Sequence, residues 1–246
     1  MQFLKAYLAL PTCYDLAGVI KRTLLPIMVM SFVVGLIWAL WIAPVDVQQG
    51  EGYRIIYLHV PCAFLSLSLY LVMGLMGLLF LVWRIKVAAI LVHCLAKVGT
   101  LFAVLALITG SIWGKPMWGT WWVWDARLTS TLILFFLYLG ILVLHNTLGW
   151  HQSRDKACAL LAIIGTINIP IIHYSVNWWN TLHQGATVAR FGAPLIALSM
   201  LKPLLFMLGC FILYTLVILC MLLQQSIAKR EAHTQWLHQR RAQNVV

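Results

Sequence analysis

Long apolar runs separated by short polar segments make up most of this chain. Six of them lie near residues 24–43, 60–83, 90–112, 129–148, 157–174 and 203–223. Each is close to the ~20 residues that cross the roughly 30 Å hydrocarbon layer as a helix, and backbone groups in lipid must be satisfied within such elements. The pattern predicts an all-α fold: a polytopic membrane protein, a six-transmembrane-helix bundle, with residues 1–246 as a single integral membrane domain.

Composition agrees with this fold class and excludes others. Hydrophobic residues make up 63% of the chain and charged residues 9%, against about 45–50% and about 25% in soluble domains. The first run follows Lys21 and Arg22 as in a signal peptide, but it is too long for one and no small-residue cleavage site follows, so we expect a permanent span. The six cysteines form no CxxC pair, which argues against a disulfide framework or a zinc site.

The net charge of +11 is informative through its distribution along the chain. Eleven lysines and arginines lie in the N-terminal segment, the loops after the second and fourth runs and the tail, and five lie in the other three loops. Cytoplasmic loops carry the excess of Lys and Arg. We therefore expect both termini in the cytoplasm, a basic cytoplasmic tail over 226–246, three outward-facing loops, and the membrane rather than nucleic acid as the partner of the positive charge.

The tryptophans show the opposite asymmetry. Nine of the twelve fall on the predicted outer side and three on the inner side, whereas an aromatic belt anchors a protein at both interfaces. The outer tryptophans are concentrated in "WGKPMWGTWWVWDARLT", residues 113–129. This concentration predicts that residues 113–128 form an outer-surface, tryptophan-rich segment with a role beyond anchoring, and a plain belt is the alternative interpretation.

As a short helix, this segment would place four side chains on one face, because residues at i, i+3, i+4 and i+7 are neighbours. These four are Trp118, Trp121, Trp122 and Asp125. The prediction is an aromatic shelf that ends in a carboxylate, with Trp124 and Arg127 turned elsewhere. A second interpretation stays open: Asp125 directly precedes an apolar run and suits a helix N-terminus, or it forms a local ion pair with Arg127.

Two histidines on other outward-facing loops flank the shelf. His59 lies in "GYRIIYLHVPCA", residues 52–63, and His183 lies in "HYSVNWWNTLHQG", residues 173–185, where it would share a helix face with Trp179. Indoles stack on flat aromatic ligands, imidazoles ligate iron and arginines pair with carboxylates. Together these groups predict a haem site.

The remaining parts of this site are less specific. Arg54, Arg127 and Lys115 are candidates for pairing with the haem propionates, and Trp113 extends the aromatic surface. His173 competes with His183 as a second iron ligand. A lone histidine near a helix end is more often an interfacial hydrogen-bonding residue, so a haem site is predicted only because two histidines lie on the same side near the tryptophans.

These segments resemble the haem exporter protein C (cytochrome c maturation protein C) family of haem-handling proteins. The run "WGKPMWGTWWVWDARLT" is similar to the family's WWD signature, and "YRIIYLHVP" and "IIHYSVNWWNTLHQG" resemble its flanking motifs in the same order. The resemblance implies that His59 and His183 are axial ligands of a transiently and non-covalently bound haem b. It also implies that the WWD segment forms a haem platform assisted by Arg54 and Arg127.

The resemblance further implies a place in c-type cytochrome biogenesis. Such proteins lie in the bacterial inner membrane, work with two ABC transporter subunits and a small one-span membrane protein, and present haem to a periplasmic haem chaperone. We therefore expect a haem-delivery component rather than a conventional enzyme. The main rival is a membrane b-type haem redox protein, which usually carries its histidine pairs inside the spans; a small-solute permease would need polar groups at mid-membrane, of which the runs have almost none.

Overall fold

The computed structural model describes residues 9–149, 151–179, 181 and 196–243. The α-helices of this part of the chain are α2 (Leu10–Ile37), α3 (Ile56–Trp83), α4 (Lys86–Trp118), α5 (Ala126–Thr147), α6 (His151–Gly165), α7 (Asn168–Trp178), α8 (Leu198–Arg230) and α9 (Gln235–Gln243). A π-helix, η1 (Trp38–Ile42), follows α2, and a 3-10 helix, η2 (Glu51–Ile55), precedes α3. Six stretches are long and apolar enough to cross a membrane, which confirms the predicted all-α, six-span membrane protein.

Several helices extend well beyond the apolar runs. The first begins at Leu10 rather than near residue 24, with Pro11 in its first turn, where proline suits a helix. α4 and α8 each have 33 residues, or about 50 Å at ~1.5 Å per residue, against a hydrocarbon layer of roughly 30 Å. These helices must tilt or project from the membrane, so their charged ends can reach water.

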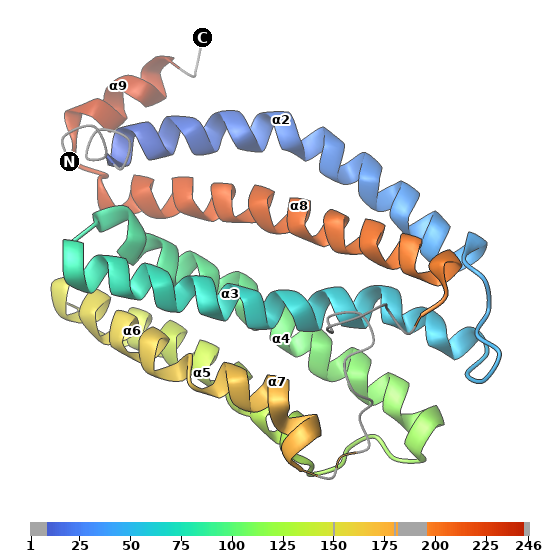
Figure 1. The fold of residues 1–246 in the computed structure, drawn as a ribbon. Helices are drawn as coiled ribbons and strands as arrows, with labels where there is room; N and C mark the ends of the chain where they lie inside the picture. The colour runs from blue at the N-terminus through green and yellow to red at the C-terminus, as the bar shows by residue number, and fades with distance from the viewer. Residues whose placement is uncertain (1–8, 150, 180, 182–195, 244–246) are drawn as a thin grey trace.

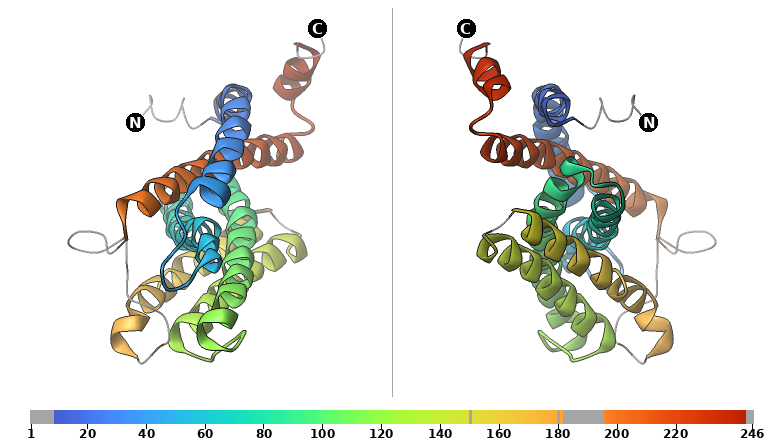
Figure 2. Two further views of the ribbon diagram at one scale, coloured as in Figure 1. Left: turned by 90° about the vertical axis from the view of Figure 1, so that its right-hand side faces the viewer. Right: turned by 90° about the vertical axis from the view of Figure 1, so that its left-hand side faces the viewer.

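Two groups of helices flank a central pair (Figures 1 and 2). α3 and α4 pack antiparallel at the centre, α5, α6 and α7 cover one side, and α8 with α2 covers the other. α2 packs mainly on α8, where Lys21 Nζ donates to Gln224 Oε1 at 2.9 Å and Gln224 Nε2 donates to the Tyr14 carbonyl at 2.9 Å. Little of α2 is buried in this chain, as expected of a helix that faces lipid or another subunit.

Small residues bring the central helices into close contact. A Cβ on Gly77 of α3 would lie 2.9 Å from the Ala159 carbonyl oxygen of α6, and one on Gly99 of α4 would overlap the Tyr138 ring of α5. The Tyr138 hydroxyl donates to the Ser66 carbonyl at 2.7 Å. Packing of this kind, with buried polar groups satisfied between helices, drives helix association where lipid removes the hydrophobic difference.

The fifth span is broken into α6 and α7. α6 ends at Gly165, where a Cβ would overlap the Tyr70 hydroxyl, and α7 begins at Asn168. The Asn168 amide donates to the Ser130 carbonyl of α5 at 2.9 Å. This hydrogen bond reattaches the chain to the bundle directly after the break and fixes where α7 points.

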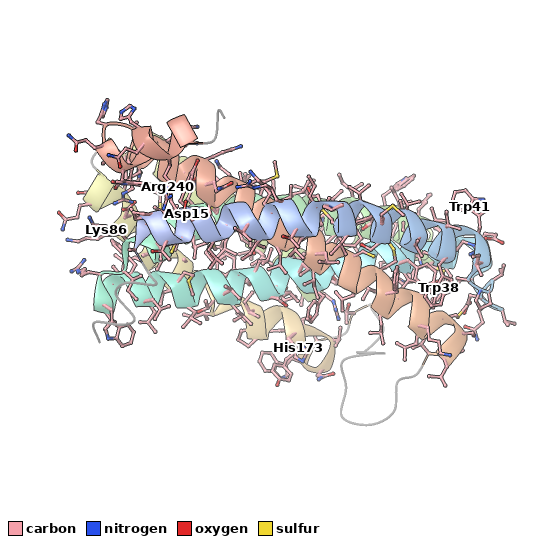
Figure 3. The ribbon with its side chains drawn as sticks, turned by 90° about the horizontal axis from the view of Figure 1, so that it is seen from above. Asp15, Trp38, Trp41, Lys86, His173 and Arg240 are labelled. Carbon is pink, nitrogen blue, oxygen red and sulfur yellow. The ribbon has the colours of Figure 1, made fainter. Side chains whose placement is uncertain are left out.

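The connections gather at two ends of the bundle (Figure 3). We call one the basic end, with the start of α2, the α3–α4 and α5–α6 turns and the end of α8; Asp15, Lys86 and Arg240 lie there. The opposite, aromatic end has the η1–η2 and α4–α5 connections and the end of α7, with Trp38 and Trp41 at its rim. The predicted inner and outer loops therefore separate onto opposite ends of the described bundle.

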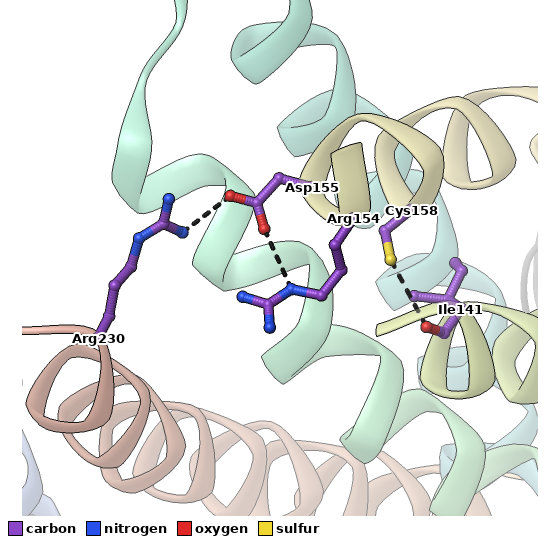
Figure 4. A network of polar contacts seen from close by, with 5 residues as sticks. All are labelled: Ile141, Arg154, Asp155, Cys158 and Arg230. Carbon is purple, nitrogen blue, oxygen red and sulfur yellow. Dashed lines mark hydrogen bonds and ion pairs between the residues drawn. The ribbon is translucent and has the colours of Figure 1, made fainter. Parts of the chain in front are cut away.

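A buried ion network ties helices together at the basic end (Figure 4). The Asp155 carboxylate of α6 is paired with Arg230 of α8, Nη1 to Oδ2 at 2.9 Å, and with its neighbour Arg154, Nε to Oδ1 at 3.7 Å. One helical turn on, Cys158 Sγ contacts the Ile141 carbonyl of α5 at 3.6 Å. The basic end is thus fixed by specific polar contacts as well as by packing.

Candidate functional site

His59 lies on the first turn of α3 with its ring seated on α4 at the aromatic end. Nδ1 of His59 is 3.0 Å from Oγ1 of Thr109. The next residue, Gly110, leaves room for the ring, because a Cβ there would lie 3.0 Å from His59 Cε1. One turn further along α4, the Trp113 ring meets the His59 ring edge-on, with centroids 5.6 Å apart and planes at 73°. Three positions on one face of α4 therefore hold the imidazole.

The connection between the first two spans packs on the same surface. In this connection the Asp46 carboxylate accepts from the backbone N–H groups of Gln48 and Gln49 at 2.9 and 2.8 Å. The Gln49 side chain in turn accepts from Trp113 Nε1 at 2.8 Å. The Trp113 indole is thereby fixed on its polar edge while its ring stays against His59.

Arg54 is engaged in local contacts. Its Nε pairs with Glu51 within η2, and its Nη1 donates to the Ala39 carbonyl of η1 at 3.1 Å. The side chain is only 15% exposed. These contacts join the end of the first span to the start of the second, so Arg54 supports the backbone that leads into His59.

The tryptophan-rich segment is not a short helix, and that prediction is wrong. α4 continues to Trp118 and ends at Gly119, whose φ of 74° is accessible to glycine without strain. Residues 119–125 form a non-helical connection, and α5 begins directly after Asp125. Gly119 ends α4 and Asp125 caps α5, and the few residues between them are too short for a separate helix. The predicted i, i+3, i+4, i+7 face therefore does not exist.

The tryptophans instead differ in exposure. Trp121 and Trp124 are 57% and 75% exposed, while Trp122 is half-buried and meets Trp124 edge-on at 5.4 Å. Nε1 of Trp122 is buried and has no hydrogen-bond partner among the described residues. Lys115 lies over the Trp121 ring at 6.0 Å. The segment therefore presents indole faces outward and keeps one buried N–H donor available.

Asp125 is a helix cap, as one of the two interpretations of the sequence had it. Its Oδ1 accepts from the Leu128 backbone N–H at 2.7 Å, and its Oδ2 accepts from the Thr181 hydroxyl, just beyond α7. The carboxylate is buried, at 8% exposure. It therefore joins the α4–α5 connection to the end of the fifth span, two residues before the half-buried Arg127.

His183, the predicted second ligand, lies outside the described residues, as do the residues from 182 to 195. The helix that leads towards it, α7, carries a row of exposed aromatic residues. His173 meets Tyr174 edge-on at 4.8 Å, and Tyr174 stacks on Trp178 at 5.4 Å and 24°. Trp179 is 51% exposed. The competing ligand His173 thus lies on an exposed aromatic surface of α7 (Figure 3).

A second pair of histidines lies inside the bundle near the basic end. The rings of His93 on α4 and His145 on α5 are stacked face to face, 3.4 Å apart at 8°. An iron with two axial imidazoles lies in the plane of each ring, between their nitrogens. Rings stacked in direct contact are not arranged as axial ligands of one haem, which argues against the b-type redox arrangement at this pair.

Comparison with known proteins identifies the family. A family model described as heme exporter protein C matches residues 3–238. The chain belongs to this family. It is 42% identical over 236 residues to heme exporter protein C of Haemophilus influenzae, which covers 96% of both chains. It is also 43% identical over 227 residues to the Escherichia coli K12 protein of that name, with 92% of this chain and 91% of the other covered. The Bradyrhizobium diazoefficiens protein is 44% identical over 193 residues, 78% of this chain and 73% of its own length.

In this member of the heme exporter protein C family, Thr109 and Gln49 are part of the candidate site but were not predicted from the sequence. Thr109 stood out in the sequence only as a hydroxyl within an apolar span, and Gln49 as an ordinary loop residue. The structure brings both to the His59–Trp113 pair. A polar residue one helical turn before Trp113 was the available signal for Thr109, whereas nothing in the sequence pointed to Gln49.

Proposed function

We propose that this protein acts in haem export for cytochrome c biogenesis, by binding haem b non-covalently at the aromatic end of its bundle. The observation that supports this proposal is the position of the His59 side chain and its contacts with α4. Its imidazole is held by a hydroxyl at 3.0 Å and by the Trp113 edge, at the same end of the bundle as the outward-facing indoles of Trp121 and Trp124. Membership of the heme exporter protein C family supports haem as the ligand.

In this proposal the iron is held by His59 and His183, one on each face of the porphyrin. The flat ring then lies against the indoles of the tryptophan-rich segment, with Trp113 behind His59. The half-buried Arg127 and the surface Lys115 pair with the propionates. Arg54, with two of its nitrogens engaged, acts by holding the backbone before His59.

The aromatic end faces the periplasm in this proposal, and both termini lie in the cytoplasm. The distribution of lysine and arginine supports this orientation. Two axial imidazoles leave no open position on iron, which suits storage and delivery rather than oxygen chemistry. A periplasmic haem chaperone then takes the haem from an exposed porphyrin edge. Release requires a change in relative affinity, supplied by contacts that the chaperone adds or by ATP hydrolysis in a complex with two ABC transporter subunits and a one-span partner.

The test is haem content after purification of the full chain in mild detergent, read from the Soret band. We expect His59→Ala and His183→Ala each to remove most of the haem. His145→Ala is the matched control, because His145 is a histidine of the same bundle whose ring stacks on His93 at the far end; it should keep normal haem content. Normal haem content in both aromatic-end variants would refute the proposed site.

A second measurement separates delivery from permanent redox use. Haem-loaded protein is mixed with the purified chaperone, and the haem remaining on the membrane protein is measured over time. Transfer to the chaperone is expected. Full retention of haem by the membrane protein, with electron exchange instead, would favour a b-type redox protein.

A further inference from the structure

The Thr109 hydroxyl lies between a backbone carbonyl and the His59 ring. Its Oγ1 is 2.6 Å from the Leu105 carbonyl oxygen, one turn earlier on α4, and 3.0 Å from His59 Nδ1 on α3. The Ala106 carbonyl oxygen is farther away, at 3.4 Å. A hydroxyl has one proton to donate and a carbonyl oxygen can only accept. The Thr109 proton is therefore donated to the Leu105 carbonyl.

This direction determines which nitrogen of His59 carries the ring proton. With its own proton donated, Thr109 Oγ1 can only accept from His59, so Nδ1 is the protonated nitrogen of the neutral ring. Nε2 then carries the lone pair, which is the form in which an imidazole ligates a metal. A hydrogen bond from the other ring N–H also fixes the ring orientation and raises the basicity of the ligating nitrogen.

The neighbours of Thr109 hold the same orientation by packing. Gly110 lets the ring approach α4 closely, since a Cβ there would lie 3.0 Å from His59 Cε1 and 3.5 Å from Nδ1. Trp113, one turn further along α4, packs edge-on against the His59 ring, with the two ring centroids 5.6 Å apart. The hydroxyl thus acts on a ring whose position is already restricted, so its main contribution is the choice of tautomer.

We propose that Thr109 is a positioning residue that keeps His59 in its iron-binding tautomer through the Nδ1–H to Oγ1 hydrogen bond. The proposal rests on the proposed function, because it takes His59 as a haem ligand. Through His59, the third span thereby affects haem affinity and redox potential. α4 then contributes to the site through its interior face as well as through the tryptophans that follow it.

The same helix provides a control for a purely structural role. Thr100 makes the same kind of side-chain bond, to the Ala96 carbonyl at 2.7 Å. It lies nine residues earlier on α4, about 13 Å along the axis at ~1.5 Å per residue. A threonine that only bonds its own helix backbone should tolerate valine, which has nearly the same shape.

The experiment titrates ferric haem into the purified full-length protein, follows the Soret band, and then measures the ferric/ferrous midpoint potential. In Thr109→Val the affinity should fall roughly 10–100-fold, as is typical when a second-shell partner of a ligating histidine is lost. The midpoint potential should rise, because a less basic imidazole stabilises ferric iron less. Thr109→Ser should restore both quantities, and Thr100→Val should change neither.

The outcomes distinguish this proposal from the proposed function. Wild-type affinity and potential in Thr109→Val, with haem lost in His59→Ala, would overturn the role of Thr109 and leave the haem site intact. Thr109→Ser failing as badly as Thr109→Val would overturn it as well. Haem kept in His59→Ala would refute both. Thr109→Ala, which removes the hydroxyl without adding a methyl group, serves as the second variant if the valine protein does not fold.

Discussion

Replacing Asp125 tests whether this carboxylate stabilises the fold or binds the ligand. In Asp125→Ala the Leu128 backbone N–H loses its cap, a loss that costs ~0.5–2 kcal/mol in other helices. The hydroxyl of Thr181 loses a charged acceptor at a buried site, which adds about 1.5–3 kcal/mol. We therefore expect the free energy of unfolding to fall by about 2–5 kcal/mol.

Asp125→Asn is the matched variant. Asparagine caps helices about as well as aspartate, and its amide can donate to the Thr181 hydroxyl where the carboxylate accepted from it. The expected loss is below about 1 kcal/mol. If Asp125 acts only on the fold, haem content per folded molecule should be nearly normal in the asparagine variant.

The assay is unfolding in mixed micelles by titration with a denaturing detergent, followed by far-UV circular dichroism, with haem content measured on the same samples. We expect a lower midpoint for the alanine variant and a near-normal one for the asparagine variant. Unchanged midpoints for both variants, together with equal loss of haem, would refute it and assign the carboxylate to the ligand.

Three further predictions concern the interior of the bundle. Gly99→Ala should destabilise the protein by about 3 kcal/mol, measured by the same unfolding titration, because the added methyl group overlaps the Tyr138 ring; a midpoint equal to wild type would show that the helices separate easily. Changing His93 and His145 together to phenylalanine should alter the unfolding free energy by less than about 1 kcal/mol, since two buried ring nitrogens without partners among the described residues are removed at once. Its haem content should be normal, and loss of the Soret band would contradict the placement of the site at the aromatic end. Asp155→Ala should cost about 3 kcal/mol because it leaves two part-buried arginines without their carboxylate, and thermal aggregation at lower temperature with normal haem content before heating is the expected result.

The bundle could be predicted from the sequence because apolar length alone fixes a membrane helix. The ends of the helices could not, since charges such as Lys21 and Arg22 were taken as the flank of the first span, whereas long basic side chains can extend towards water from within a helix. The break at Gly165 was also missed, because one glycine in an apolar run gives no strong signal.

The candidate site was predicted in its components more than in its geometry. Asp125 was recognisable as a cap from its place before an apolar run, whereas the ligand role that the motif indicates for His59 stays a prediction. The helical face assigned to the tryptophans was wrong, although Gly119 and Asp125 already mark the end of one helix and the start of the next. The contacts of Thr109 and Gln49 link residues 50 and 64 positions apart, and such pairings follow from tertiary packing rather than from local pattern.

The contacts of His59 also bear on the order in which parts of the bundle form during synthesis. His59, Thr109 and Trp113 lie in the second and third spans, and Gln49 lies in the connection before the second, so their mutual contacts can form as soon as α4 has left the ribosome and entered the membrane. The tryptophan-rich connection and the end of α7 follow later in synthesis. The side of the proposed site that holds His59 can therefore form before the other side has been synthesised.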